Sequence, residues 1–169
     1  GKGWKIEHIC QGDSWDSSAS SPLAAAGLNV KDGDYILAVN GLQVSHDNSP
    51  HERLINLGGQ RVSLAISKDV NGEESRTITA KTVISDTSIR YREWVDDNRK
   101  IVHEASAGKL GYIHIPDMGP EGYAEFFRGF LPEVERTGLV VDARFNRGGH
   151  VSQLLLEKLA RKRLGYDIQ

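Results

Sequence analysis

The sequence predicts an α+β chain in two parts joined by a long helix, and three features of the residue pattern support this prediction. Before residue 85, short stretches of alternating apolar and polar residues are separated by Gly, Asn and Pro turns, which is typical of a small antiparallel sheet. Residues 88–106 then carry apolar side chains at helical spacing. Beyond them, strands and helices alternate, which indicates a parallel pair of strands.

The first part contains predicted strands over 3–9, 35–39, 62–67 and 76–83, and predicted helices over 21–28 and from 49 to about 57. Each helix begins with Ser followed by Pro, the residues favoured at the N-cap and the first helical position. In the second helix, Glu52 follows Ser49 at the spacing of a capping box. Asn40-Gly41 and Asn71-Gly72 predict tight turns between strands.

The second part begins at Asp86 with the amphipathic helix, which is expected to end before Gly108. A strand over 110–115, a helix from 121 to about 131, a strand after Gly138 and a helix through 154–160 are expected to follow. Two parallel strands are too few for a complete α/β domain.

Composition limits the classes of function. The chain has 169 residues, of which 38% are apolar and 26% charged, as expected for a soluble globular protein with no membrane span. The net charge of −2 gives no reason to expect a nucleic-acid partner. Cys10 has no partner for a disulfide and no neighbouring His or basic cluster, so we expect an inert thiol. The His spacings fit no zinc pattern, and we expect neither a metal nor a cofactor.

The most informative stretch is Leu139–Gln153, in which an apolar strand, two glycines and a helix start follow one another. Such a turn lets backbone N–H groups converge on an anion, because glycine has no Cβ and the helix N-terminus is partially positive. In acyl-transfer enzymes that anion is the tetrahedral oxyanion. The alternative is a tight structural connection. Ser152 is expected to be a first-turn hydroxyl that satisfies a free helix N–H, rather than a nucleophile.

Two long runs carry a resemblance to a known family. They lie within 89–119, IRYREWVDDNRKIVHEASAGKLGYIHIPDMG, and within 139–167, which includes RFNRGGHVSQLLLEKLARKRLGYD. Both resemble tricorn-type serine peptidases, which are part of the wider family of C-terminal processing proteases. The string SPLAAAGLNVKDGDYILAVNG resembles the central motif of a bacterial PDZ domain, in the permuted strand order of processing proteases.

The resemblance implies three segments. Residues 1–85 would form a PDZ-like, partly open β-barrel with two short helices, and residues 86–109 a linking amphipathic helix. Residues 110–169 would form the incomplete opening of a crotonase-like α/β domain. The family's nucleophilic Ser is expected after the last residue and its base His before the first. We therefore expect an excised piece of an enzyme that is inactive alone.

The resemblance also implies site residues. Gly149 would supply the oxyanion-hole N–H, and Gly148 would permit the turn. Asp167 would be the acidic residue that favours basic side chains at the cleavage site, supplied across a subunit contact. Trp4 and Ile6, on one face of the first strand, could line a peptide groove, although such a pair is more often core. The role of Arg147, where a small residue is expected, stays open.

The resemblance implies that the complete protein is an endopeptidase that cleaves oligopeptides. A role downstream of the proteasome is compatible with this resemblance. Peptide substrates, a cytoplasmic location and a homo-oligomer, hexameric in the family, are implied with it. The alternative is a free-standing peptide-binding PDZ module without catalysis, in which the Gly-Gly turn is only structural.

Overall fold

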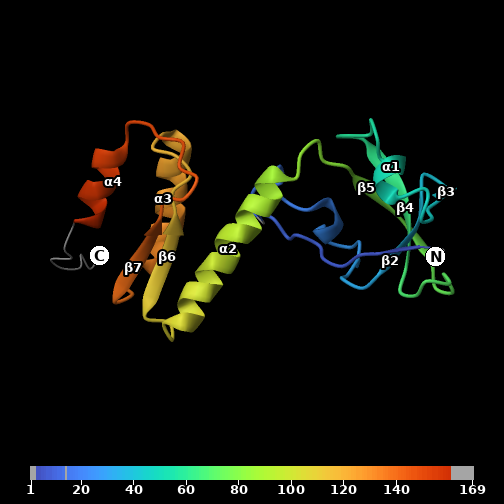
Figure 1. Ribbon diagram of the computed structural model, residues 1–169, viewed down its shortest axis with the longest axis horizontal. Helices are drawn as coiled ribbons and strands as arrows, with labels where there is room; N and C mark the ends of the chain where they lie inside the picture. Colours follow the sequence, from blue (N-terminus) through green and yellow to red (C-terminus); the bar gives the residue numbers. More distant parts are fainter. Residues whose placement is uncertain (1–2, 14, 161–169) are drawn as a thin grey trace, which may run out of the picture. The chain divides into compact units, whose positions relative to one another are not determined.

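The computed structural model describes residues 3–13 and 15–160. The chain divides into two compact units, Gly1–Trp94 and Val95–Gln169, whose helices and strands are labelled in Figure 1. Each unit has its own hydrophobic core. Helix α2 (Thr87–Ala105) contains the boundary between them. The α+β fold class expected from the sequence is confirmed.

The first unit is built on an antiparallel sheet. Its strands run in the order β1-β2-β4-β5, and β3 pairs with β2 outside this path. Their bounds are Trp4–Lys5 (β1), Tyr35–Val39 (β2), Leu42–Gln43 (β3), Arg61–Ser67 (β4) and Arg76–Lys81 (β5). Between β2 and β3, Asn40 and Gly41 have φ values of 50° and 77°. Two left-handed residues are what a type I′ hairpin turn requires, so the predicted Asn-Gly turn is confirmed.

The two helices of this unit are shorter than predicted. α1 (Pro50–Arg53) is a single turn, in which the Glu52 N–H donates to Ser49 Oγ and the Ser49 N–H donates to the Glu52 carboxylate. This confirms the predicted capping box. η1 (Pro22–Ala24) is only a 3-10 turn, because Ala25 is already extended at φ −60° and ψ 139°. The prediction of a two-turn helix over 21–28 is wrong.

The core of the first unit lies on one face of its sheet. In β4, Val62, Leu64 and Ile66 are at most 6% exposed and alternate with more exposed residues, as the period of two demands. The remaining buried members are Val39, Val44, Ile78 and Ala80. The strand predicted over 3–9 is reduced to β1, although Ile6 still exchanges backbone hydrogen bonds with Gly33 and Asp34.

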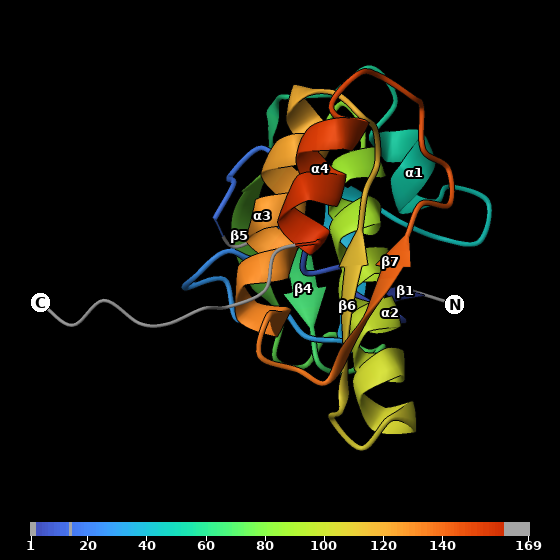
Figure 2. The same cartoon turned by 90° about the vertical axis from the view of Figure 1, so that its left-hand side faces the viewer.

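The second unit contains the predicted parallel pair. β6 (Leu110–His114) pairs with β7 (Gly138–Asp142) in register along their whole lengths. Helices α3 (Pro120–Glu133) and α4 (Ser152–Leu159) lie beside these strands (Figure 2). The core is formed by Ile113, Ile115, Phe126 and Leu155.

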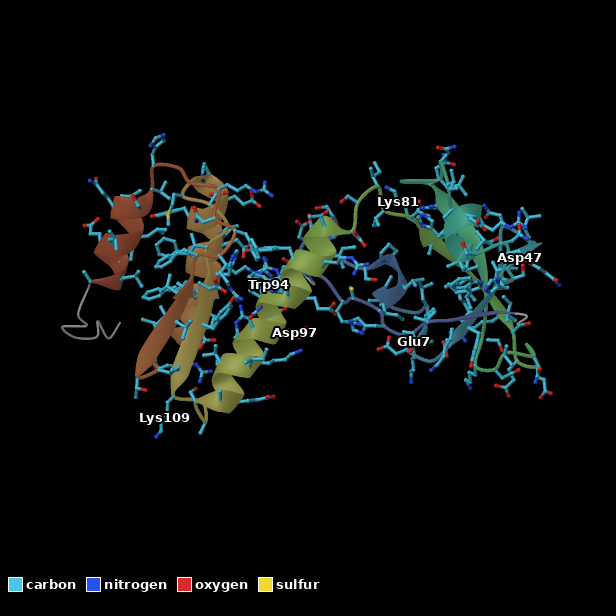
Figure 3. All side chains as sticks on the ribbon, in the orientation of Figure 1. Glu7, Asp47, Lys81, Trp94, Asp97 and Lys109 are labelled. Atoms are coloured by element: carbon cyan, nitrogen blue, oxygen red, sulfur yellow. The ribbon has the colours of Figure 1, made fainter. Side chains whose placement is uncertain are left out.

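Helix α2 confirms the amphipathic helix that the sequence predicts. Ala107 and Gly108 have positive φ values, and the Gly108 N–H donates to the His103 carbonyl at 2.7 Å, so the helix ends there. Figure 3 shows Asp97 on α2 and Lys109 at the turn into β6. No helix in the described part of the chain is both long and apolar enough to cross a membrane.

Strand β7 pairs with β6 along one edge, and no strand among the described residues pairs with its other edge. Val140 and Val141, which point to opposite faces, are 37% and 40% exposed. Central strands of α/β sheets are normally covered on both faces. The exposure of both faces of β7 therefore indicates that β6 and β7 are part of an incomplete sheet.

Candidate functional site

Two loops are joined by backbone hydrogen bonds at the carboxyl ends of β6 and β7. One is the segment 115–119, between β6 and α3, and the other is the segment 143–151, between β7 and α4. The Met118 N–H donates to the Gly148 carbonyl at 2.7 Å, and the Met118 carbonyl accepts from the N–H groups of His150 and Val151 at 2.6 and 2.9 Å. These bonds fix the path of the glycine turn.

Positions 148 and 149 require glycine for different structural reasons. Gly148 has a φ of 78°, which favours glycine, but an added Cβ would meet nothing within 4 Å. Gly149 has a φ of 140°, and an added Cβ would lie 2.1 Å from the Met118 carbonyl oxygen. A side chain at position 149 would therefore force the two loops apart.

Gly149 is an exposed residue, and its N–H has no acceptor among the described residues. Its neighbours are all used within the structure: the Arg147 N–H donates to the Pro116 carbonyl at 3.0 Å, and the Gly148 N–H donates to Asn146 Oδ1 at 2.7 Å. The Asn146 side-chain amide in turn donates to the Ile115 carbonyl at 2.9 Å. One N–H in a fixed loop is thus available to an acceptor from outside.

The N-terminus of α4 adds partial positive charge close to this N–H group. Its N-cap is Val151, and no side chain caps its first turn. Ser152 makes no hydrogen bond with any described residue, so the prediction that its hydroxyl satisfies a helix N–H is wrong. The partially positive end of the helix therefore follows Gly149 without a neutralising side chain.

A buried carboxylate anchors the beginning of the loop. Asp142, at the end of β7, accepts from the Tyr112 hydroxyl at 2.6 Å and from the Arg144 guanidinium at 2.6 to 3.0 Å. The Arg144 backbone N–H also donates to this carboxylate, at 2.9 Å. His114 Nε2 donates to the Arg144 carbonyl at 2.8 Å, and Arg144 Nη2 donates to Asn98 at 3.0 Å. The loop thus leaves the sheet from a rigid polar cluster.

This cluster shifts the ionisation of its members. Hydrogen bonds from Arg144 hold the pKa of Asp142 well below its usual range, against the opposing effect of burial. Burial, followed by the hydrogen bond to Asp142, raises the pKa of Tyr112. At neutral pH the carboxylate is ionised and the phenol is protonated, which is the state that the hydrogen bond requires.

Trp4 and Ile6 line neither of two cavities found in the first unit, one of about 1020 Å³ and one of about 550 Å³. The cavity of about 550 Å³ is lined by residues of the 8–10 segment, η1, α1 and the sheet. Trp4 is 41% exposed and donates from Nε1 to the Ser45 carbonyl, while Ile6 is buried. Neither residue lines the cavity, and their role in peptide binding stays a prediction. Asp167 lies outside the described residues.

Comparison with protein families gives two matches along the chain. Residues 1–85 match the tricorn protease PDZ domain. Residues 109–168 match peptidase family S41. The loop around Gly149 therefore lies in the S41 part.

Curated relatives cover nearly all of this chain. It is 47% identical over 166 residues to the tricorn protease homolog of Saccharolobus solfataricus, a match that spans 98% of this chain and 15% of the relative. It is 41% identical over 156 residues to the tricorn protease of Thermoplasma acidophilum, spanning 92% of this chain and 14% of the relative. The chain thus spans about one seventh of the length of these relatives.

One related protein is a putative tricorn-like protease C-terminal subunit of Sulfurisphaera tokodaii, 44% identical over 99% of this chain and 19% of its own. Among solved structures, the crystal structure of the tricorn protease superposes with a TM-score of 0.88 at 39% identity, over 99% of this chain and 16% of that one. The chain therefore belongs to the tricorn protease family, and it contains that family's PDZ domain and the first part of its S41 serine peptidase domain.

Proposed function

We propose that this chain supplies the PDZ domain and the oxyanion-hole turn of a serine endopeptidase that cleaves oligopeptides. In this proposal, the Gly149 N–H donates to the oxyanion that forms when a serine attacks the scissile carbonyl. The nucleophilic serine and the base histidine come from parts of the whole enzyme other than this chain.

The observation that carries the proposal is the free N–H of Gly149. An oxyanion donor must be fixed before the reaction and must have no internal acceptor that competes for it. The bonds of Met118 to the loop meet the first condition, and the absence of a described acceptor for Gly149 meets the second. Gly148 provides the left-handed conformation that precedes the donor.

The remaining assignments follow from this function. Residues 1–85 would act as the PDZ-like domain, 86–109 as the linking helix and 110–169 as the start of the catalytic domain. Asp167 would select basic side chains at the cleavage site. The free edge of β7 would pair with a further strand of the complete sheet, and the whole enzyme would assemble as a homo-oligomer, with peptides as substrates.

The experiment has two arms. The pure 169-residue chain should not hydrolyse a basic fluorogenic peptide above the buffer rate. In the second arm, this chain replaces the matching 166 residues of the Saccharolobus solfataricus homolog, and the folded chimera should hydrolyse the same peptide. Activity of the short chain alone, or a folded chimera without activity, would contradict the proposal. An Asp167→Asn chimera should lose preference for basic over neutral peptides.

A second function is favoured by the cavity of about 550 Å³ in the first unit. Its lining is largely apolar, with Leu23, Leu54 and Ile89 among the lining side chains, and its volume suits one or two peptide side chains. A peptide-binding PDZ module would use it without catalysis. Titration with labelled peptides that carry free C-terminal carboxylates tests this function, with amidated peptides as controls. Equal binding of both sets, or no binding, would count against it.

A further inference from the structure

His8, Cys10 and Glu93 form a cluster that the proposed peptidase function does not use. Their side-chain ligand atoms all lie within 4.8 Å of one another, although His8 and Glu93 are 85 residues apart in sequence. His8 Nε2 is 2.8 Å from Glu93 Oε1, and Cys10 Sγ lies within 4.8 Å of both side chains. The prediction of an inert Cys10 without a neighbouring His missed this arrangement.

The geometry points to a divalent-metal site in which His8 Nε2, Cys10 Sγ and the Glu93 carboxylate bind one Zn²⁺ ion. An imidazole, a thiolate and a carboxylate together form a mixed ligand set that zinc accepts readily. With ordinary zinc bond lengths, ligand atoms in a tetrahedral site lie roughly 3.3–3.8 Å apart. Side-chain adjustments of about 1 Å bring the present cluster to that spacing.

The surroundings of His8 support the assignment. Asp32 Oδ2 lies 3.3 Å from His8 Nδ1, on the ring nitrogen opposite the one that faces Glu93. A carboxylate on the second nitrogen is a common partner of metal-binding histidines, because it fixes the tautomer and orients the ring. Asp32 is itself held in place, since its Oδ1 accepts from the Ile9 N–H at 2.8 Å. Asp32 thus contacts both the His8 ring and the backbone of Ile9, which lies between His8 and Cys10 in the sequence.

Charge balance also favours a divalent cation. His8 Nε2 already lies 2.8 Å from Glu93 Oε1, so a cation between them would replace the proton that they share. A thiolate, a carboxylate and a neutral imidazole together carry two negative charges, which Zn²⁺ balances.

The site is open to solvent. The side chains of His8 and Glu93 are 57% and 21% exposed. His8 and Cys10 also line the cavity of about 550 Å³, so the fourth coordination position could be filled by water from this cavity. The expectation of no metal site, which was based on sequence spacing, is replaced by this proposal.

The test uses the untagged, reduced 169-residue chain and Co²⁺ and Zn²⁺ as the probes. Co²⁺ should bind in a one-to-one ratio and give a thiolate-to-cobalt charge-transfer band, and Zn²⁺ should displace it with release of protons. Cys10→Ser should abolish the band, and His8→Ala should weaken Zn²⁺ binding at least tenfold. Asp32→Asn should weaken binding about 10- to 100-fold while a sulfur–cobalt band remains.

The matched control is His46→Ala. His46 pairs with Asp47 on the exposed surface at 3.3 Å, and Figure 3 shows Asp47 at the end of the first unit where α1 and β3 lie. Unchanged Zn²⁺ affinity is expected. X-ray absorption of the zinc-loaded wild-type chain should show one sulfur ligand among nitrogen and oxygen ligands, whether or not the variants fold. Absence of sulfur from the zinc shell, or no saturable binding, would overturn the proposal.

Discussion

The carbonyl oxygen of Met118 occupies the space into which a Cβ on Gly149 would project, at 2.1 Å from the ideal Cβ position. The same oxygen accepts from the N–H groups of His150 and Val151. The segment after β6 and the segment after β7 therefore determine each other's path. This relationship fixes the direction of the Gly149 N–H, and several expected outcomes depend on it.

Gly149→Ala should destabilise the chain more than Gly148→Ala does. The first change adds a clash with the Met118 carbonyl to an unfavourable backbone conformation, and we expect a loss of roughly 2–4 kcal/mol. The second change adds only the conformational cost, about 1–2 kcal/mol, because its Cβ meets open space. Urea unfolding monitored by circular dichroism compares the two. Equal losses would show that the contact with Met118 does not constrain the loop.

Tyr112→Phe should lower the free energy of unfolding by about 1.5–3 kcal/mol, because it removes a hydrogen bond to the buried Asp142 carboxylate. Tyr123→Phe is the control, since that hydroxyl has no hydrogen-bond partner among the described residues. Its loss should stay below about 0.5 kcal/mol. A similar effect of both substitutions would argue against the polar cluster as an anchor of the loop.

The same cluster predicts a loss of stability at alkaline pH. The pKa of Tyr112 is raised in the folded state, so its contribution is complete below the unfolded-state phenol pKa of about 10. The contribution is lost as pH rises through the folded-state pKa. Urea unfolding should show stability falling above pH of about 10, and Tyr112→Phe should make that fall smaller. A wild-type curve with the same slope as the variant's would contradict this account.

His8 should titrate above the ordinary histidine pKa of 6.5 in the metal-free chain. Hydrogen bonds to Glu93, and then to Asp32, favour its protonated form. The stabilisation from these pairs is complete below pH 6.5 and is lost as pH rises through the folded-state pKa. NMR titration should show the pKa of His8 falling in Glu93→Gln and unchanged in Glu74→Gln, whose carboxylate pairs with Lys68. An unchanged value in Glu93→Gln would contradict the pairing.

Trp4→Ala tests the peptide groove expected at β1. The Trp4 indole donates to the Ser45 carbonyl, and its ring is partly exposed. If Trp4 contacts peptide, the variant should lose at least tenfold in affinity for peptides with free carboxylates, at matched thermal stability. Unchanged affinity would show that Trp4 does not line the peptide site.

Local signals in the sequence predicted the local structure well. The capping box of Ser49 and Glu52 and the turn at Asn40-Gly41 depend on residues within one turn of each other, so both could be predicted from the sequence. Ser21 and Pro22 marked the start of η1 correctly, but the predicted helix to residue 28 does not form, because the chain is already extended at Ala25. A local start signal does not fix the length of a helix.

Contacts between distant residues could not be predicted in this way. The resemblance identified Gly149, but nothing in the sequence paired it with Met118, because their contact depends on the parallel register of β6 and β7. The pairing of Tyr112 with Asp142 depends on the same register. His8 and Glu93 come together only when the 8–10 segment lies along α2. Periodicity describes one element at a time and carries no information on such pairs.

The most direct measurement concerns the Gly149 N–H itself. In the active chimera, incorporation of glycolic acid at position 149 replaces this N–H with an ester oxygen and adds no Cβ. We expect kcat to fall by roughly 100- to 1,000-fold with little change in KM, because the donor acts on the transition state. An unchanged kcat in the folded ester variant would show that Gly149 is not the oxyanion donor.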